Sequence, residues 1–385
     1  MSSGRPVVIW RSCLLFGSET FVRDQGAALS RWRPTYVGAV KVASPLAADT
    51  DVVAFPDGRL GFPLLRLTGG SRRLDATLRS LRPDLVHAHF GGDGWLISRT
   101  AARLNIPLVI TLHGRDVTTQ AAAPGLRGSR YRRNLRTAFD RAALILAVSG
   151  PVADRALALG ADPAKVRVHH TGVPLPAESH APKEWDVAFV GRFVPKKGLD
   201  DLVEALAMLD RPVKAVLIGA GPLEPAIRAR AAGLGLDATF PGHQDPASVR
   251  RHVAAARVFV APSKTAPDGD AEGLPTTILE AAALGVPTVS TRHSGIPEAV
   301  RHGETGLLGT EGDRVTLAAN LRHLLADDDL RARLGHAARA HVTANFDITT
   351  QTRSLEALYD TVAPIMTESG PAGGPWTPSR TPPMR

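Results

Sequence analysis

Two successive runs of short apolar segments alternating with longer amphipathic segments constrain this chain most. The short segments have the composition of buried strands, and the segments between them have helical spacing. Such alternation is typical of βαβ units, in which helices cover both faces of a parallel sheet. The elements expected in the first run are residues 7–10, 20–32, 51–54, 64–81, 85–87, 95–104, 108–111, 129–141 and 144–148.

A proline-rich segment separates the two runs. Pro174, Pro176 and Pro182 mark a stiff polar linker, and the alternation resumes at Asp186. A chain of 385 residues is long enough for two domains. We therefore predict an α/β fold with parallel-sheet domains over residues 1–175 and 176–345, helices near 313–326, 329–345 and 348–362, and a disordered tail over 367–385.

The segment EGLPTTILE carries the most specific local signal. Pro275 suits the first helical position, and Leu274, as N-cap, has no side-chain oxygen for the free N–H groups that begin at Thr276. An uncapped helix start is a ready site for an anion, phosphate especially. Glu280 can accept hydrogen bonds from hydroxyls such as those of a ribose, and Glu272 lies in the loop before the helix. The alternative is an ordinary helix with an exposed glutamate at each end.

A second pattern suited to an anion follows the first strand of the second run. Its loop holds Arg192, Lys196 and Lys197 between two glycines, after a buried strand and before a helix expected from about Leu199. Arginine offers forked hydrogen bonds and lysine a mobile positive charge, which together suit a diphosphate. The alternative is a set of surface cations at the end of a strand.

Two glycine loops at strand ends are weaker signals. Gly17 follows the first strand, at the edge where open α/β sheets bind ligands, and it lets backbone approach a ligand closely. Gly221 belongs to AVLIGAGP, another strand and glycine turn. No G-x-G-x-x-G follows the first strand of either run, which disfavours a dinucleotide oxidoreductase.

Taken together, these motifs resemble the donor-site signature of retaining glycosyltransferase family 4. The matching segments are Glu-x7-Glu around GLP, LGVPTV, SGIPEAV, GETGLL and the G-R-x-x-x-x-K-G of residues 191–198, with FGSETF, TLHGRD and HHTGVP as weaker matches. The resemblance covers most of the chain, weakly in the first domain and strongly over residues 186–308.

The resemblance implies a GT-B architecture, in which two Rossmann-like domains face each other across a cleft and a C-terminal helix, residues 346–366, packs back on the first domain. It implies transfer of a sugar, with retention, from a UDP- or GDP-linked donor to an acceptor hydroxyl. Arg192 and Lys197 are then expected to bind the diphosphate, and His113 and Glu272 to position the sugar. The donor-binding residues that it implies are Gly17, Gly221, His243, Gly273, Leu274, Pro275, Thr276 and Glu280.

The SETF and DGD-AEGLP forms of these motifs resemble those of bacterial exopolysaccharide assembly, which implies a glycan or lipid-linked acceptor. The Asp268–Asp270 pair is interpreted as a loop feature, so we expect no essential metal and no cofactor beyond the nucleotide sugar as co-substrate.

The net charge of +9 is unevenly distributed. Residues 1–180 carry 24 Lys and Arg against 13 Asp and Glu, so the first half holds the whole basic excess. A basic face attracts anionic lipid headgroups, an anionic acceptor or nucleic acid, while the plain alternative is a solvated arginine-rich surface. No recognised nucleic-acid module or aromatic interleaving accompanies it, so nucleic acid is not expected as a partner. The densest patch, interpreted as an acceptor or membrane face, is Arg127, Arg130, Arg132, Arg133 and Arg136.

Composition adds the expected location. Cys13 is the only cysteine, no run of eighteen apolar residues occurs, and MSSGRPVVIW lacks the features of a signal peptide. We expect a cytoplasmic protein, peripheral at the inner face of the plasma membrane if the basic face binds lipid.

Two other function classes remain open at this point. A nucleotide-sugar epimerase of the same architecture would interconvert donors with no acceptor present. A non-catalytic nucleotide-sugar-binding protein would keep Arg192 and Lys197 and turn nothing over.

Overall fold

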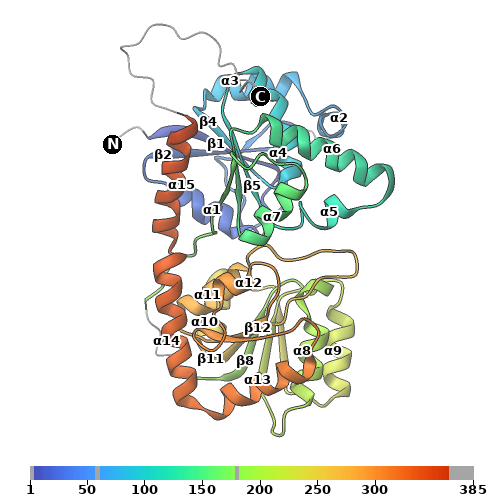
Figure 1. Cartoon of the computed structure of the whole chain (residues 1–385), viewed down its shortest axis with the longest axis vertical. Helices are drawn as coiled ribbons and strands as arrows, with labels where there is room; N and C mark the ends of the chain where they lie inside the picture. The colour runs from blue at the N-terminus through green and yellow to red at the C-terminus, as the bar shows by residue number, and fades with distance from the viewer. Residues whose placement is uncertain (1–3, 57–60, 178–181, 364–385) are drawn as a thin grey trace, which may run out of the picture.

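The computed structural model describes residues 4–56, 61–177 and 182–363, which form two α/β domains stacked along the long axis of the molecule (Figure 1). Each domain contains one parallel sheet. The sheet of the first domain has the order β3-β2-β1-β4-β5-β6-β7, and that of the second has the order β10-β9-β8-β11-β12-β13. In both sheets the strand order reverses beside the first strand, between β1 and β4 and between β8 and β11, which is where open α/β sheets bind ligands.

The first domain contains these elements: β1 (Arg5–Leu14), α1 (Thr20–Ala27), β2 (Trp32–Lys41), β3 (Val52–Val53), α2 (Gly61–Thr68), α3 (Arg72–Leu81), β4 (Leu85–His89), α4 (Gly91–Arg103), β5 (Leu108–Leu112), α5 (Thr119–Ala122), α6 (Gly125–Arg141), β6 (Leu144–Ala147), α7 (Gly150–Ala158) and β7 (Val166–Val168).

The second domain contains these: β8 (Trp185–Val190), the 3-10 turn η1 (Pro195–Lys197), α8 (Leu199–Ala207), β9 (Ala215–Ile218), α9 (Glu224–Gly233), β10 (Ala238–Gly242), α10 (Pro246–Ala254), β11 (Ala256–Ala261), α11 (Thr276–Ala283), β12 (Thr288–Thr291), α12 (Ile296–Ala299), β13 (Gly306–Gly309), α13 (Arg314–Ala326) and α14 (Asp328–Asn345). The last helix, α15 (Ile348–Val362), returns to the first domain (Figure 1).

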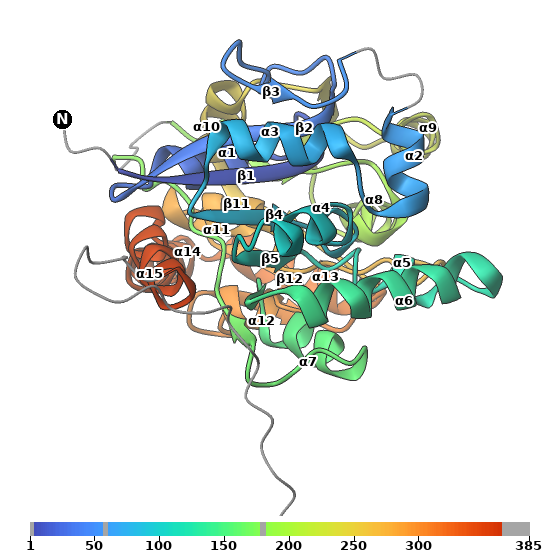
Figure 2. The same ribbon diagram turned by 90° about the horizontal axis from the view of Figure 1, so that it is seen from above.

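Apolar strands covered on both faces explain why the fold class is visible in the sequence. Every residue of β5 (LVITL) and of β9 (AVLI) is buried, because helices lie on both sides of each sheet (Figures 1 and 2). The prediction of two Rossmann-like parallel-sheet domains is therefore confirmed.

Two of the predicted helices are wrong in extent. The helix expected over 20–32 ends at Ala27, and β2 begins at Trp32 and includes Pro34. β3 pairs only with Val37 and Gly38, so the outer side of β2 is unpaired at Pro34 and accommodates a residue without an N–H. The helix expected over 64–81 is two helices, because the chain breaks at residues 69–70 and Ser71 caps the start of α3.

The helix α15 is attached to the first domain by buried polar contacts. The carboxylate of Glu356 accepts hydrogen bonds from the backbone N–H groups of Ser30, Arg31 and Trp32, at 2.6 to 3.2 Å, and from the Ser30 hydroxyl at 2.9 Å. Tyr359, one turn further on, is fully buried against β4. The chain thus passes between the domains twice, near Val173 and again before α15.

The predicted domain limits stay predictions, and the tail expected to be disordered lies outside the described residues. Within the described part of the chain, no helix is long and apolar enough to cross a bilayer.

We predict that Glu356→Gln lowers the free energy of unfolding by about 1–3 kcal/mol, because the amide presents donors to N–H groups that are buried with it. Burial opposes ionisation of Glu356, but the backbone donors outweigh burial and hold the pKa of the carboxyl below its usual value. Its contribution is therefore complete above the ordinary carboxyl pKa and is lost as the pH falls through the lower folded value. Urea unfolding at several pH values measures this.

The matched control is Glu304→Gln, since the side chain of Glu304 is exposed. A deficit in Glu356→Gln no larger than in this control, or one that grows toward acid pH, would contradict the account.

Candidate active site

A lysine–glutamate ion pair lies at the carboxyl edge of the second sheet, beside the point where its strand order reverses. Lys197 Nζ is 2.7 Å from Glu272 Oε1, and Lys196 Nζ is 3.7 Å from Glu272 Oε2. Both lysines belong to η1, which Gly198 ends with a φ of +65°. A Cβ at position 198 would lie 1.9 Å from the carbonyl oxygen of Pro262, so only glycine lets the lysine loop approach the chain after β11.

Glu272 is buried but ionised. Burial raises its pKa, but Lys197 and Lys196 outweigh burial and lower the pKa to about 2. The Ser263 hydroxyl adds a contact at 3.4 Å to Oε1. The backbone N–H of Glu272 donates to His293 Nε2 at 3.0 Å, so the proton of His293 is on Nδ1, 2.6 Å from Glu311. Glu272 therefore accepts hydrogen bonds at neutral pH and has no proton to donate.

The start of α11 lacks a side-chain cap, as the sequence predicts, although its position differs by one residue. The N-cap is Pro275, not Leu274, because Pro275 has extended backbone angles (φ −68°, ψ 109°) and the helix begins at Thr276. The N-cap residue gives no side-chain hydrogen bond to the first turn of this helix. The N–H of Ile278 donates to the carbonyl oxygen of Pro275, so the N–H groups of Thr276 and Thr277 are the ones that suit an anionic ligand.

His113 meets Gly273 where the two domains touch. A Cβ at Gly273 would lie 2.3 Å from the carbonyl oxygen of His113, and a Cβ at Gly114 would lie 2.8 Å from the backbone nitrogen of Gly273. Ser149, at the start of α7, donates to the carbonyl oxygen of Gly273 at 3.1 Å. The loop after β5 therefore lies directly against the loop that carries Glu272.

His113 is neutral and half-buried. Burial, with Arg11 and His87 nearby, lowers its pKa to about 3. Its ring packs on Phe21 and Phe90, at centroid distances of 4.8 and 4.5 Å. A neutral imidazole on an apolar wall suits an uncharged sugar.

The other donor-site candidates lie around this centre. Glu280 lines a small pocket with Arg250 and Thr277, and burial and then Asp24 of α1 raise its pKa. Asp24 of α1 also interacts electrostatically with Arg250 of α10, and α1 lies at the end of the first domain that faces α10 and α11 (Figure 1). Gly17 lies against His243, whose Nε2 would be 3.8 Å from a Cβ at position 17.

Arg192 and Gly221 belong to adjoining loops. The backbone N–H of Phe193 donates to the carbonyl oxygen of Ala220, and a Cβ at Gly221 would lie 2.5 Å from the carbonyl oxygen of Phe193. Arg192 is exposed and, among the residues that the structure describes, forms no salt bridge. Unlike Lys197, it is free to turn toward a ligand.

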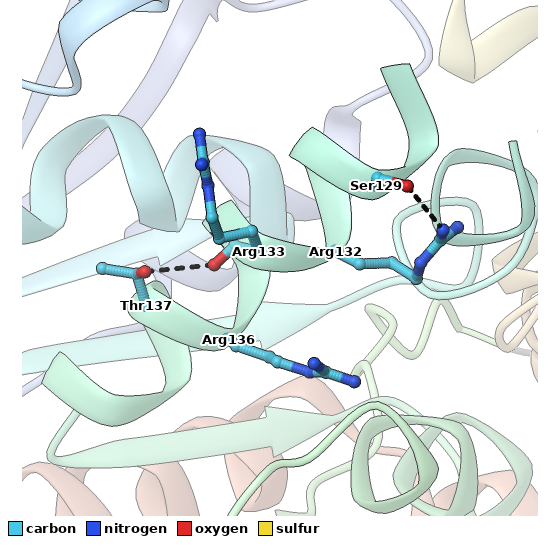
Figure 3. A pocket seen from close by; sticks show the side chains of 5 residues that line it. All are labelled: Ser129, Arg132, Arg133, Arg136 and Thr137. Carbon is cyan, nitrogen blue, oxygen red and sulfur yellow. Dashed lines mark hydrogen bonds between the residues drawn. The ribbon is translucent and has the colours of Figure 1, made fainter. Parts of the chain in front are cut away.

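The predicted basic face lies on α6, apart from the Lys197–Glu272 pair. Ser129, Arg132, Arg133, Arg136 and Thr137 line a pocket of about 370 Å³ (Figure 3). Arg132 donates to the carbonyl oxygen of Ala121 at 2.8 Å, whereas Arg133 extends away from Arg132 and Arg136. Arg130 donates to the carbonyl oxygens of Arg66 and Leu67 and so joins α6 to α2, and Arg127 is exposed.

The acidic loop before Glu272 has its own partner. Lys196 Nζ is 3.2 Å from Asp270, and the backbone N–H of Asp270 donates to Asp268. Across residues 4–56, 61–177 and 182–363, no three His, Cys, Asp or Glu side chains are grouped so as to hold a metal ion.

Sequence reasoning missed a buried triad that holds the Gly17 loop. Arg11 pairs with Glu19 at 2.5 Å and with Asp93, and all three side chains are buried. Glu19 Oε2 also accepts from the backbone N–H of Phe16 at 3.3 Å. Glu19 is the acidic residue of SETF. The signal in the sequence that could have indicated its partner is Arg11, a charged residue within an apolar strand.

A second missed residue is Glu298, of SGIPEAV, which joins the domains. Its carboxylate accepts from the backbone N–H of Gly150 at 2.8 Å and is 2.7 Å from His170 Nε2. Because no side chain caps α7 at its own N-cap, Glu298 supplies that cap from the other domain.

Comparison with known proteins decides the family. Residues 17–176 match the family "Glycosyltransferase Family 4", and residues 176–341 match "Glycosyl transferases group 1". The putative colanic acid biosynthesis glycosyltransferase WcaL of Salmonella typhimurium is 32% identical over 292 residues, which are 72% of this chain and 71% of that protein. The chain belongs to glycosyltransferase family 4.

Other similar proteins agree. The amylovoran biosynthesis glycosyltransferase AmsK of Erwinia amylovora is 29% identical over 302 residues, 75% of this chain and 72% of that protein. Anabaena Alr3699/HepE, solved in complex with UDP, superposes with a TM-score of 0.75 at 21% identity, covering 93% of this chain and 100% of its own. The predicted GT-B architecture is therefore confirmed, and this glycosyltransferase is similar to enzymes of exopolysaccharide biosynthesis. The roles of the individual site residues stay predictions.

We predict that Gly273→Ala separates the two loops at the domain contact, because the new methyl group would overlap the carbonyl oxygen of His113. The glycosyltransferase should stay folded, with amide hydrogen exchange about tenfold faster in peptides covering residues 111–118 and 147–152. The control is Gly233→Ala at the end of α9, where a Cβ would have no neighbour within 4 Å. Equal exchange in the two variants would show that the contact does not hold the domains together.

Proposed function

We propose that this glycosyltransferase moves a sugar, with retention of anomeric configuration, from a nucleoside-diphosphate sugar to an acceptor hydroxyl of a cell-surface polysaccharide. The observation that carries this proposal is the ion pair of Lys197 with the ionised Glu272, which lies just before the uncapped start of α11, with the exposed Arg192 in the same loop as Lys197. The three positive groups suit a diphosphate, and the carboxylate suits sugar hydroxyls.

In the proposed reaction the bond from the anomeric carbon to the diphosphate oxygen breaks, and the bond to the acceptor oxygen forms on the same face. The chief demand is to stabilise the negative charge that develops on the departing diphosphate. Arg192, Lys197 and the first turn of α11 meet that demand. The departing phosphate takes the acceptor proton, so no dedicated base is required, and Glu272, already ionised, positions the sugar with His113.

The donor is a UDP- or GDP-linked sugar, in keeping with the UDP bound to HepE. The transfer is metal-independent, since Lys196 pairs with Asp270 and the diphosphate charge is met by cations of the chain. An epimerase or a non-catalytic binding protein is less favoured, because the named relatives are glycosyltransferases.

We predict that one nucleotide sugar of a panel, with EDTA present and no acceptor, is slowly hydrolysed to its nucleoside diphosphate. Arg192→Ala and Lys197→Ala should each slow this release by about 100-fold or more, because each removes a positive side chain that stabilises the negative charge on the departing diphosphate. The control is Arg333→Ala, which removes an exposed arginine of α14. Epimerisation of the donor, a requirement for a divalent metal, or equal rates in all three variants would each contradict the proposal.

We propose further that the acceptor is lipid-linked and that the basic face docks on an anionic membrane from the cytoplasmic side. Three exposed leucines adjoin the arginines of α6: Leu126 at its start is 90% exposed, and Leu64 and Leu67 of α2 are 58% and 62% exposed. The hydrogen bonds from Arg130 hold α2 against α6. A surface that combines arginines with exposed leucines suits the headgroup region of a bilayer.

We predict that the double variant Arg127→Glu with Arg133→Glu weakens binding to phosphatidylglycerol vesicles by about 30-fold or more, since each cation near an anionic surface contributes about 1 kcal/mol. Neither side chain has a salt-bridge partner among the described residues, so the fold should be unaffected. Arg333→Glu with Arg353→Glu changes net charge equally on the C-terminal helices and serves as the control. Equal loss in both double variants would exclude a specific docking face.

A further inference from the structure

Three histidine rings lie in a stack at the carboxyl ends of β4 and β5. The rings of His87 and His89 are 4.4 Å apart and nearly parallel, and those of His89 and His113 are 5.3 Å apart. His89 Nδ1 and His113 Nε2 are hydrogen-bonded at 3.1 Å. Nothing in the reaction proposed above uses His87 or His89.

His87 is fixed at both nitrogens. Its Nδ1 bonds the hydroxyl of Tyr359 on α15 at 2.5 Å, and its Nε2 bonds the hydroxyl of Thr111 at 2.7 Å. The His87 ring therefore gives His89 a rigid surface to stack on. Burial lowers the pKa of His87 to about 3, and burial and then the neighbouring histidines lower that of His89 well below its ordinary value.

All three rings are therefore neutral, and each carries one N–H. The His89–His113 hydrogen bond then has only two arrangements, since one nitrogen must donate and the other accept. If His113 Nε2 carried the proton, His89 Nδ1 would accept it and the His89 proton would be on Nε2. If His89 Nδ1 carries the proton, His113 Nε2 accepts, and the His113 proton is on Nδ1.

The environment of His89 Nε2 separates these arrangements. His89 is 1% exposed, and its Nε2 is buried with no hydrogen-bond partner. A proton there would be a buried donor without an acceptor, whereas the other arrangement leaves only a lone pair unpaired, and orphaned buried N–H groups are the rarer case. His89 Nδ1 is the donor.

We propose that His89 is a positioning residue that holds His113 in its Nδ1–H tautomer, so that His113 presents a hydrogen-bond donor to an oxygen of the donor sugar. No hydrogen bond to His113 Nδ1 occurs among the described residues, and His113 is half-buried, so Nδ1 is the ring nitrogen left for a ligand. This role rests on the proposed function. With Nε2 accepting from His89 and Nδ1 protonated, His113 has no lone pair to take a proton from the acceptor hydroxyl.

The tautomer is measured directly by NMR of the full chain labelled with ¹⁵N-histidine, with His113→Gln used to assign the His113 signals. In the wild type we expect Nδ1 of His113 in the range of a protonated ring nitrogen and Nε2 in the range of an unprotonated one. The reverse pattern would overturn the proposal whether or not a donor is turned over.

Three substitutions at residue 89 test its control of that tautomer. His89→Asn keeps a donor where Nδ1 lies and should keep the tautomer. His89→Phe keeps the stacked ring without a donor and should give a mixture, and His89→Asp offers only an acceptor and should move the proton to Nε2. The wild-type tautomer in all three variants would show that His89 does not set it.

Donor hydrolysis provides the second measurement. His89→Phe and His89→Asp should lower kcat about tenfold with little change in KM, the size expected for one lost hydrogen bond, while His89→Asn retains activity. If the NMR result is as expected but no nucleotide sugar is bound or hydrolysed, the proposed function fails and the tautomer assignment stands. If hydrolysis occurs and His89→Phe matches the wild type, the positioning role fails.

Discussion

The contact between the loop after β5 and the loop before α11 is the constraint on which the site depends. His113 and Gly114 come from one domain and Glu272 and Gly273 from the other, and each glycine faces backbone of the opposite loop with no room for a methyl group. Two side chains from different domains can face one ligand only if their backbones approach this closely. On the second domain's side of this contact, the charged groups are those of the Lys197–Glu272 ion pair.

Other contacts also join the two domains. The two passages of the chain are bonded to each other, since the N–H of Val173 donates to Phe346 and the N–H of Ile348 donates to Val173. Glu298 caps α7 on the far side of Ser149. The two domains are therefore joined at residues 173 and 346–348, at the Glu298 cap and at the Gly273 contact.

The sequence predicted whatever depends on local pattern. Apolar strands gave the two sheets, and the start of α15 at Ile348 follows from the acidic cap Asp347 before an amphipathic segment. The lysine loop and EGLP were each recognised as an anion pattern, and the family resemblance joined them as one site; the Lys197–Glu272 pair brings the two segments together. The N-cap of α11 differed by one residue, because proline tolerates both positions.

Contacts between distant segments could not be predicted in this way. The pairing of Arg11 with Glu19 and Asp93 depends on how β1 and α4 are juxtaposed, which no local spacing records. The role of His89 could not be predicted, because the stack with His87 and His113 exists only once β4 and β5 are adjacent in register. The break between α2 and α3 was missed because the seven-residue spacing of Leu67 and Leu74 fits one helix, although Gly69 and Gly70 between them favour a turn.

The site combines a carboxylate that stays charged with an imidazole that stays neutral, and the same physical cause cannot explain both. Burial alone would neutralise Glu272 and His113 alike. The two lysines of η1 reverse its effect on Glu272, while Arg11 adds to it at His113. The lysines of the second domain thus keep Glu272 ionised as a hydrogen-bond acceptor, and Arg11 of the first domain helps to keep the His113 ring uncharged. With the pKa of Glu272 near 2 and that of His113 near 3, neither group changes its charge near neutral pH. The arrangement of a charged carboxylate opposite a neutral imidazole therefore depends on the contact between the two domains rather than on pH.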